Sequence, residues 1–110
     1  MSGKKDKVKD SERFSIIVPA LNRCMVCGTD QRVCIHEVFY GTANRKKSKE
    51  FGLVVPLCYE HHQGTNGVHF NKVLDLKLKQ QAEKIWLKEN NATIDEFIKI
   101  FGKNYLDGGE

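Results

Sequence analysis

The sequence predicts a small α+β domain in which two short strands are braced by a metal-binding knuckle and followed by two C-terminal helices. Two pairs of metal-ligand residues with matched spacing lie in the first half of the chain. Segments rich in β-branched and aromatic residues lie between and beside these pairs, and two segments with helical periodicity follow. At 110 residues the chain forms one domain with a modest core, which a structural metal would supplement.

The metal-ligand pairs are C-x2-C, formed by Cys24 and Cys27, and C-x2-H, formed by Cys58 and His61. Tetrahedral zinc takes thiolate and imidazole ligands from two tight turns of this kind. The spacing therefore predicts one structural Zn²⁺ site held by these four residues. Cys34 is interpreted as a small buried filler, although it could compete with His61 as the fourth ligand.

Residues 32–40 are rich in strand formers and predict the first strand. Strict alternation places His36 on one face, with Cys34 and Val38, and Glu37 on the other unless a bulge intervenes. The second strand is expected at residues 51–55, ending at Pro56.

Three further segments complete the expected domain. Residues 14–18, stopped by Pro19, read as a short strand or an extended segment docked on the core. Residues 71–90 carry an apolar helical stripe with Asn71 as N-cap, and a second helix begins at a Thr93–Glu96 capping box and stops at Gly102. The second helix is expected to pack on the first.

Charge and composition limit the classes of partner that the protein is expected to have. The 18 Lys and Arg residues outnumber 14 Asp and Glu, giving a net charge of +4 that suits an anionic partner. No apolar run is long enough to span a membrane, and the charged N-terminus does not resemble a signal peptide. We therefore expect a cytoplasmic protein with a domain at residues 14–106, a disordered charged tail at 1–13 and a frayed end at 107–110.

Outside the four zinc ligands, five polar residues remain in the same region: His36, Glu37, Asn44, His62 and His69. With them the chain resembles the HNH (ββα-metal) endonuclease superfamily, in its small phage-associated form with a zinc-knuckle frame. The matching stretches are C-M-V-C at 24–27, I-H-E-V-F-Y-G at 35–41, A-N-R at 43–45, L-C-Y-E-H-H at 57–62 and a similar tail at 96–106. The resemblance covers residues from about 20 to 106.

This resemblance implies a ββα-metal core and an endonuclease that hydrolyses DNA phosphodiester bonds inside a phage-infected or bacterial cell. It implies a second, catalytic divalent metal (Mg²⁺, Mn²⁺, Ni²⁺ or Zn²⁺), with Asn44 orienting the attacking water and His62 as a ligand. One turn after the first helical ligand stands Asn66, so His69 is the better third imidazole. No small-molecule substrate or membrane partner is expected.

The identity of the general base stays open between two neighbours. Either His36 is the base and Glu37 a ligand or orienter, or Glu37 is the base and His36 the ligand. An imidazole with a pKa near about 6.5 is better matched to proton abstraction at neutral pH than a carboxylate near about 4.3, which favours His36.

A basic loop is expected at residues 41–50, and its cations are candidate contacts to DNA phosphates. They are Arg45, Lys46, Lys47 and Lys49. The alternative function is a noncatalytic zinc-stabilised nucleic-acid-binding module, which needs the cysteines and the basic residues but no second metal. A zinc-stabilised protein-interaction domain is a third interpretation.

Overall fold

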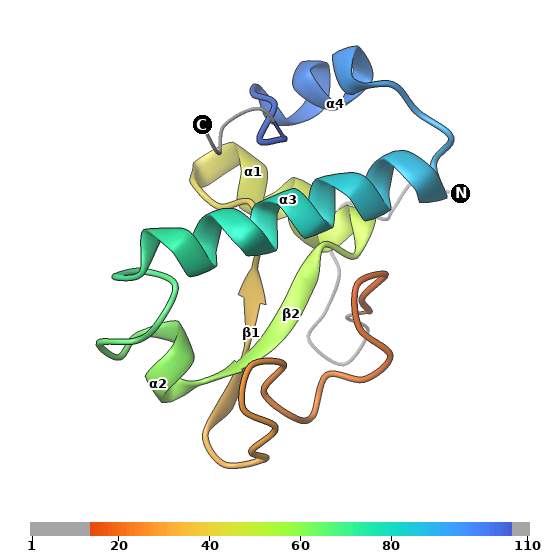
Figure 1. The fold of residues 1–110 in the computed structure, drawn as a ribbon. Coiled ribbons are helices and arrows are strands. Elements are labelled where there is room, and N and C mark those ends of the chain that lie inside the picture. Colours follow the sequence, from red (N-terminus) through yellow and green to blue (C-terminus); the bar gives the residue numbers. More distant parts are fainter. Residues whose placement is uncertain (1–13, 107–110) are drawn as a thin grey trace.

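The computed structural model describes residues 14–106, which form a small mixed α/β domain (Figure 1). The expectations for residues 1–13 and 107–110 lie outside the described residues. The elements in chain order are β1 (Val33–Glu37), α1 (Thr42–Phe51), β2 (Val54–Cys58), α2 (Tyr59–His62), α3 (Lys72–Glu89) and α4 (Ile94–Phe101). The α+β class is therefore confirmed, with two antiparallel strands and two C-terminal helices.

The second strand lies three residues further along the chain than the sequence indicated, and Pro56 is at its centre. Pro56 faces Ile35 in the antiparallel ladder, and its carbonyl accepts a hydrogen bond from the Met25 amide at 2.9 Å. A residue's amide and carbonyl point to the same edge of a strand, so the missing proline N–H falls on the edge away from β1. The ladder therefore loses no hydrogen bond, and proline does not end the strand.

The segment expected as a basic loop is the helix α1, and this corrects the prediction. Its Ala, Lys, Arg and Glu residues are good helix formers, although a run of charge is also typical of loops. Gly41 and Gly52 bracket it with φ angles of 102° and 73°. Gly52 adopts the left-handed conformation at the C-cap, so that the chain reverses directly into β2.

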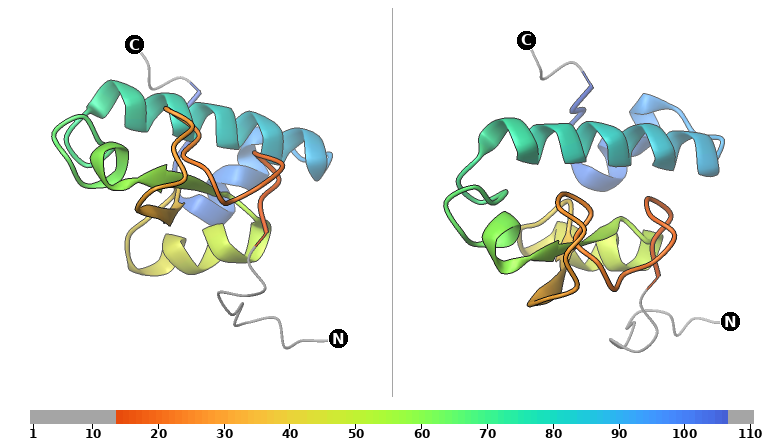
Figure 2. Two further views of the ribbon diagram at one scale, coloured as in Figure 1. Left: turned by 90° about the horizontal axis from the view of Figure 1, so that it is seen from below. Right: turned by 60° about the horizontal axis from the view of Figure 1, so that its bottom comes forward.

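The two C-terminal helices confirm the predicted caps. The Asn71 side chain accepts hydrogen bonds from the Val73 and Leu74 amides, and Thr93 and Glu96 form the reciprocal capping box. The second of these helices, α4, lies between α1 and α3 and contacts both (Figure 2). Among residues 14–106, no helix combines the length and apolar character needed to cross a membrane.

The core is an aromatic cluster where the strands meet these helices. Phe39, which follows β1, lies 5.3 Å from Phe97 and 4.9 Å from Phe101 between ring centroids, and Trp86 of α3 lies 5.5 Å from Phe97. Each of these side chains is buried. Since aromatic side chains bury large areas, this cluster ties α3 and α4 to the sheet.

The segment at residues 14–18 is docked but is not a strand. The Ser15 hydroxyl donates to the Val54 carbonyl at 2.8 Å, and the Ile16 amide donates to the Gly52 carbonyl at 2.9 Å. Ser15 Oγ also accepts from the amides of Ile17 and Val18, which bends the chain locally. The docking expectation is confirmed, and the strand alternative is wrong.

We expect Ser48→Ala to lower the free energy of unfolding by about 1–3 kcal/mol, because the fully buried Ser48 hydroxyl accepts from the Phe39 amide at 3.0 Å and donates to the Phe39 carbonyl at 2.7 Å. Urea denaturation measures the loss. Lys46→Ala on the exposed side of α1 is the matched control. Equal stability of the two variants would show that these hydrogen bonds contribute little.

Candidate metal centres

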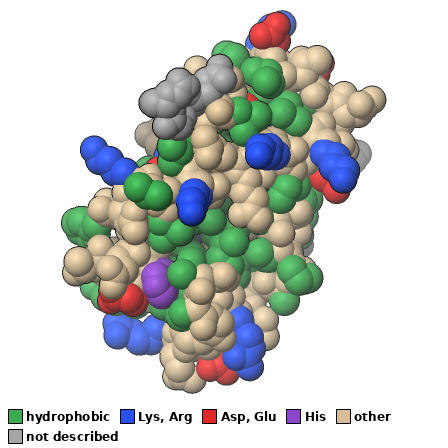
Figure 3. Space-filling view, viewed as in Figure 1, with side chains coloured by type: hydrophobic (Ala, Val, Ile, Leu, Met, Phe, Trp, Pro, Cys, Tyr) green, Lys and Arg blue, Asp and Glu red, His purple; other side chains and the backbone are tan. Residues whose placement is uncertain are grey.

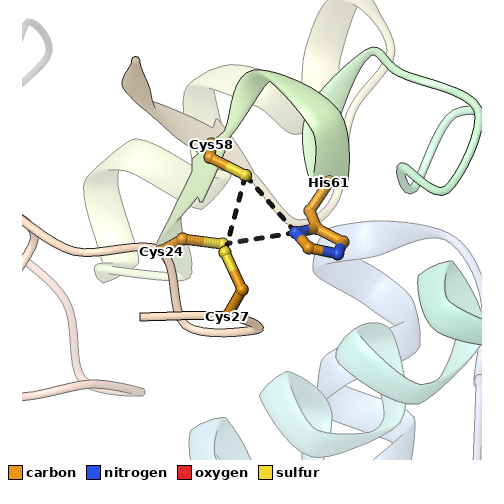
Figure 4. Close-up of side chains that lie close together, drawn as sticks. All are labelled: Cys24, Cys27, Cys58 and His61. Atoms are coloured by element: carbon orange, nitrogen blue, oxygen red, sulfur yellow. Dashed lines mark hydrogen bonds between the residues drawn. The ribbon is translucent and has the colours of Figure 1, made fainter. Parts of the chain in front are cut away.

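The four predicted zinc ligands converge at the end of β2 (Figure 4). Cys27 Sγ lies 3.8 Å from Cys58 Sγ, and His61 Nδ1 lies 3.3 Å from Cys58 Sγ and 3.8 Å from Cys24 Sγ. Zinc bond lengths of about 2.3 Å to sulfur and about 2.0 Å to nitrogen give tetrahedral edges of about 3.8 Å (S···S) and about 3.5 Å (S···N). The observed spacings are close to these edges, so the group could hold a zinc ion.

The first knuckle is preformed by its own backbone. The Cys24 carbonyl accepts from the Gly28 amide at 2.8 Å, the Cys24 amide donates to the Thr29 carbonyl, and the Val26 amide points at Cys24 Sγ at 3.4 Å. Gly28 has a φ of 80°, which a residue with a side chain rarely adopts. The Met25–Pro56 hydrogen bond ties this knuckle to β2 and brings the two ligand pairs together.

The electrostatics of Cys24 favour the thiolate that zinc requires. Burial alone would raise the pKa of this thiol, but backbone hydrogen bonds at Cys58, Cys27 and Val26 lower it to about 6. This lowered pKa favours the thiolate form of Cys24, which is the form that binds a metal.

The short helix α2 separates two histidines that are adjacent in sequence. Neighbouring side chains on a helix point about 100° apart. His61 turns toward the cysteines, whereas the His62 ring lies 5.0 Å from the His36 ring and 5.0 Å from the His69 ring. The two adjacent histidines therefore face different groups of side chains.

The second cluster is formed by His36, His62 and His69, one nitrogen of each lying within 4.8 Å of one nitrogen of the others. His36 comes from β1, His62 from α2 and His69 from the turn before α3. His36 is 3% exposed, His62 is half-buried and His69 is exposed, so the cluster runs from the interior to the surface. On the face shown in Figure 3, a histidine side chain reaches the surface beside apolar side chains, with an acidic side chain next to it and Lys and Arg side chains further out.

The turn that returns His69 to this cluster depends on a close backbone approach. The Val68 amide donates to the His61 carbonyl at 3.0 Å, and Val68 is buried. A Cβ atom on Gly67 would lie 2.7 Å from the His62 carbonyl carbon, closer than any real contact of that kind. A glycine is therefore needed at position 67 to bring His69 beside His62.

His36 carries an orphaned polar atom. Its Nε2 is buried and has no hydrogen-bond partner among the described residues. Burial lowers the pKa of His36 to about 3, helped by the nearby His62, His69, Lys79 and Arg45. The imidazole is therefore neutral at physiological pH, and a neutral imidazole nitrogen without a partner is suited to bind a metal.

Cys34 is exposed, so the prediction that it is a buried filler is wrong. Its side chain lies on the same face of β1 as His36, and its sulfur is 3.2 Å from His62 Nδ1. Burial of part of the side chain raises the pKa of this thiol, and the charges of Cys58, Glu37 and Cys24 raise it further. Cys34 is outside the group of four that could hold zinc.

Two further residues were predicted to take part in catalysis, Glu37 and Asn44, and neither belongs to the three-histidine cluster. The register of β1 is regular at His36 and Glu37, so they occupy opposite faces and no bulge re-aims either. Burial and His69 lower the pKa of His62, and the charge of Glu37 opposes both. Asn44 is turned toward α4, where its amide donates to the Phe101 carbonyl at 3.1 Å.

A polar group that the sequence did not single out borders the cluster. The Tyr40 ring lies 5.7 Å from the His36 ring and 5.6 Å from the His69 ring, and Lys79 Nζ lies 4.3 Å from its centroid. Lys79 also pairs with Asp75 at 2.8 Å. The i,i+4 spacing of Asp75 and Lys79 is visible in the sequence, but this spacing is common on solvated helix faces and did not indicate a site.

The basic residues of α1 divide between two faces. Asn44, Lys47 and Ser48 share the inner face, and Lys47 Nζ donates to the Ile100 carbonyl at 2.5 Å. Arg45 and Lys46 are exposed and Lys49 is half-buried. Two of the four predicted phosphate contacts are therefore open to solvent and Lys49 is partly so, whereas Lys47 is engaged with the end of α4.

Comparison with known proteins adds no relative: the chain matches no family model, no curated protein and no solved structure.

We expect the purified protein to contain one zinc ion per chain, and we expect its removal to unfold the domain, because the four ligands join three segments around a modest core. Metal analysis with thermal denaturation in chelator measures both. Cys58→Ser should lose the zinc, whereas Cys34→Ser, the matched control outside the ligand set, should keep it. A zinc-free purified protein, or a Cys58→Ser variant within about 1 kcal/mol of wild type, contradicts the site.

Proposed function

We propose that this protein is a metal-dependent endonuclease that hydrolyses phosphodiester bonds in DNA, built on a ββα-metal frame of the HNH type. The observation that carries the proposal is the three-histidine cluster, with the orphaned Nε2 of His36 at its buried end. The order of His36, Asn44 and His62 within a zinc-ligand frame adds the resemblance to that superfamily.

The geometry supports His36 as a ligand rather than as the base. A general base must reach a water molecule next to the substrate, whereas His36 is buried, with only 3% of it exposed. Its nitrogen lies with those of His62 and His69 in an arrangement that could hold a cation. We therefore assign the three imidazoles to the metal. Glu37 leaves β1 on the other face from His36, but it is the last residue of the strand and its charge acts at His62. We assign proton abstraction to this half-buried carboxylate.

The chemistry divides among these groups. His36, His62 and His69 would hold a divalent metal, which would supply positive charge next to the phosphate and make a nearby water more acidic. Glu37 would accept a proton from that water as its oxygen forms a bond to phosphorus. The bond from phosphorus to the leaving oxygen breaks in the same step, and solvent protonates the leaving oxygen. Lys79 and Arg45, whose charges act at His36, neutralise charge that builds on the phosphate. Asn44 anchors α1 to α4 and thereby holds Arg45 in place.

A noncatalytic nucleic-acid-binding module is the rival function. Such a module needs the zinc ligands and the outward cations of α1. It has no use for three imidazoles brought together, one of which carries a buried nitrogen with no partner among the described residues, because such a nitrogen costs free energy when nothing binds it. The cost favours a function in which the cluster is filled.

We expect variants of His36 and Glu37, which are neighbours on β1, to respond differently to added metal. His36→Ala should weaken metal affinity, so that part of its plasmid-nicking activity returns at raised Mg²⁺ or Mn²⁺ concentration. Glu37→Gln should instead lower the rate at saturating metal by about 10² to 10⁴, the usual contribution of a positioned base. Nicking of supercoiled plasmid, followed by gel electrophoresis, measures both.

Gln63→Ala, an exposed position directly after α2, is the control and should cleave like wild type. Zinc content of each variant confirms that the frame is intact. The reversed pattern would make His36 the base. Nicking that survives in both variants, or that is absent from wild type with every metal, removes the enzyme and leaves the binding module.

We expect replacement of Arg45, Lys46 and Lys49 together by Gln to weaken binding to DNA of any sequence. The slope of log affinity against log salt should fall by about 0.9 for each duplex phosphate that these side chains no longer neutralise. Fluorescence anisotropy at several salt concentrations measures the slope. Lys47→Gln is the matched control: because its amine is bonded to the Ile100 carbonyl, it should lower stability and leave the slope unchanged. An unaltered slope in the triple variant would mark this face of α1 as merely solvated.

A further inference from the structure

We infer that Cys34 is a positioning residue for the three-histidine cluster: its thiol fixes the tautomer and the orientation of His62. The inference rests on the proposed metal site and assigns a task to a residue that neither the zinc frame nor the proposed catalytic groups use. It starts from two contacts of one sulfur atom. Cys34 Sγ lies 3.5 Å from the Leu57 carbonyl oxygen and 3.2 Å from His62 Nδ1.

The direction of these hydrogen bonds follows from the count of hydrogens. A carbonyl oxygen can only accept, so both contacts are hydrogen bonds at the same time only if the single hydrogen of the thiol is directed to Leu57. The sulfur can then only accept from His62, which requires the hydrogen of the imidazole to be on Nδ1. His62 Nε2 is left with its lone pair free, which is the form that a metal binds.

The fold explains why a cysteine can reach both partners. In the β ladder Cys34 is paired with Leu57, so its side chain stands beside that residue's backbone. Alternation along β1 places Cys34 and His36 on the same face, two residues apart. His62 therefore meets two side chains of one strand: the Cys34 sulfur at Nδ1, and the His36 ring at 5.0 Å.

Groups that hold the second nitrogen of a metal-binding histidine typically change metal affinity by about 10- to 100-fold when they are removed. His62 needs such a group, because it is on a helix of only four residues and is partly exposed. Without the sulfur its ring would be free to rotate and to place a hydrogen on Nε2. Cys34 thus links the sheet to a histidine of the cluster that the sheet does not carry directly.

The test is a calorimetric titration of the zinc-loaded protein with Ni²⁺, with zinc content checked afterwards. We expect wild type to bind one Ni²⁺ per chain and Cys34→Ala to bind it about 10- to 100-fold more weakly, with zinc retained. Cys34→Ser, which keeps a donor and an acceptor at this position, should recover most of the affinity. Ile35→Val, the next residue on β1 and on its other face, is the matched control and should equal wild type.

A second readout reports the tautomer itself. In long-range ¹H–¹⁵N spectra of the zinc-loaded protein without Ni²⁺, His62 should carry its hydrogen on Nδ1 in wild type and in Cys34→Ser, and this preference should be lost in Cys34→Ala. A His62 hydrogen on Nε2 in wild type overturns the inference. So does a Cys34→Ala affinity for Ni²⁺ equal to that of wild type, in which case the proposed enzyme stands. If wild type binds no Ni²⁺ beyond its zinc, the histidine site fails and the role of Cys34 fails with it.

Discussion

Three sulfur atoms and one imidazole nitrogen converge at the end of β2, and this convergence constrains the paths of three separate segments. The knuckle at residues 24–27, the last residue of β2 and the single turn of α2 must all meet there. The strands do not supply a comparable constraint, since β1 and β2 alone form a two-stranded sheet. Two strands need further packing to be stable in water. Here the four zinc-ligand residues supply it at one end of the sheet, and the aromatic cluster supplies it at the other.

The two histidine-containing sites share this constraint because His61 and His62 are adjacent. Once His61 Nδ1 is directed at Cys58, the rotation of about 100° per helical residue fixes the direction of His62. The backbone of His61 also accepts from Val68, which returns the chain to His69. The backbone of two members of the three-histidine cluster is therefore placed by the first site, whereas His36 is carried by the sheet itself.

The features that the sequence could predict are those whose signals lie close together along the chain. The grouping of the four zinc-ligand residues, the Asn71 cap and the Thr93–Glu96 box depend on fixed local spacings, and the structure has each of them as predicted. The placement of α1 and β2 differs from the prediction, because helix propensity competes with a charge pattern typical of loops and because Pro56 resembles a strand end. Whether a proline ends a strand depends on which edge its missing N–H faces, and that edge is known only after pairing.

Contacts made by tertiary packing had no local signal. Cys34 has no spacing partner in the sequence, and its meeting with His62 requires the ladder register and the turn of α2 together. The approach of Lys79 to Tyr40 likewise joins a helix to the connection between β1 and α1, which is far away in sequence. Residue types indicated which chemistry the chain could perform, but the neighbours of each group came from the fold.

Pro56 also affects how the chain behaves before it has folded. All five residues of β2 are buried, and such an apolar strand is a template for pairing with other chains whenever its edge is uncovered. In the folded domain the Met25 amide covers that edge at Pro56. When the knuckle opens, as in a newly made or metal-starved chain, the proline offers no donor in the middle of the strand, and a second strand cannot extend across it. The residue that anchors the knuckle therefore also protects the chain from aggregation before the knuckle has closed.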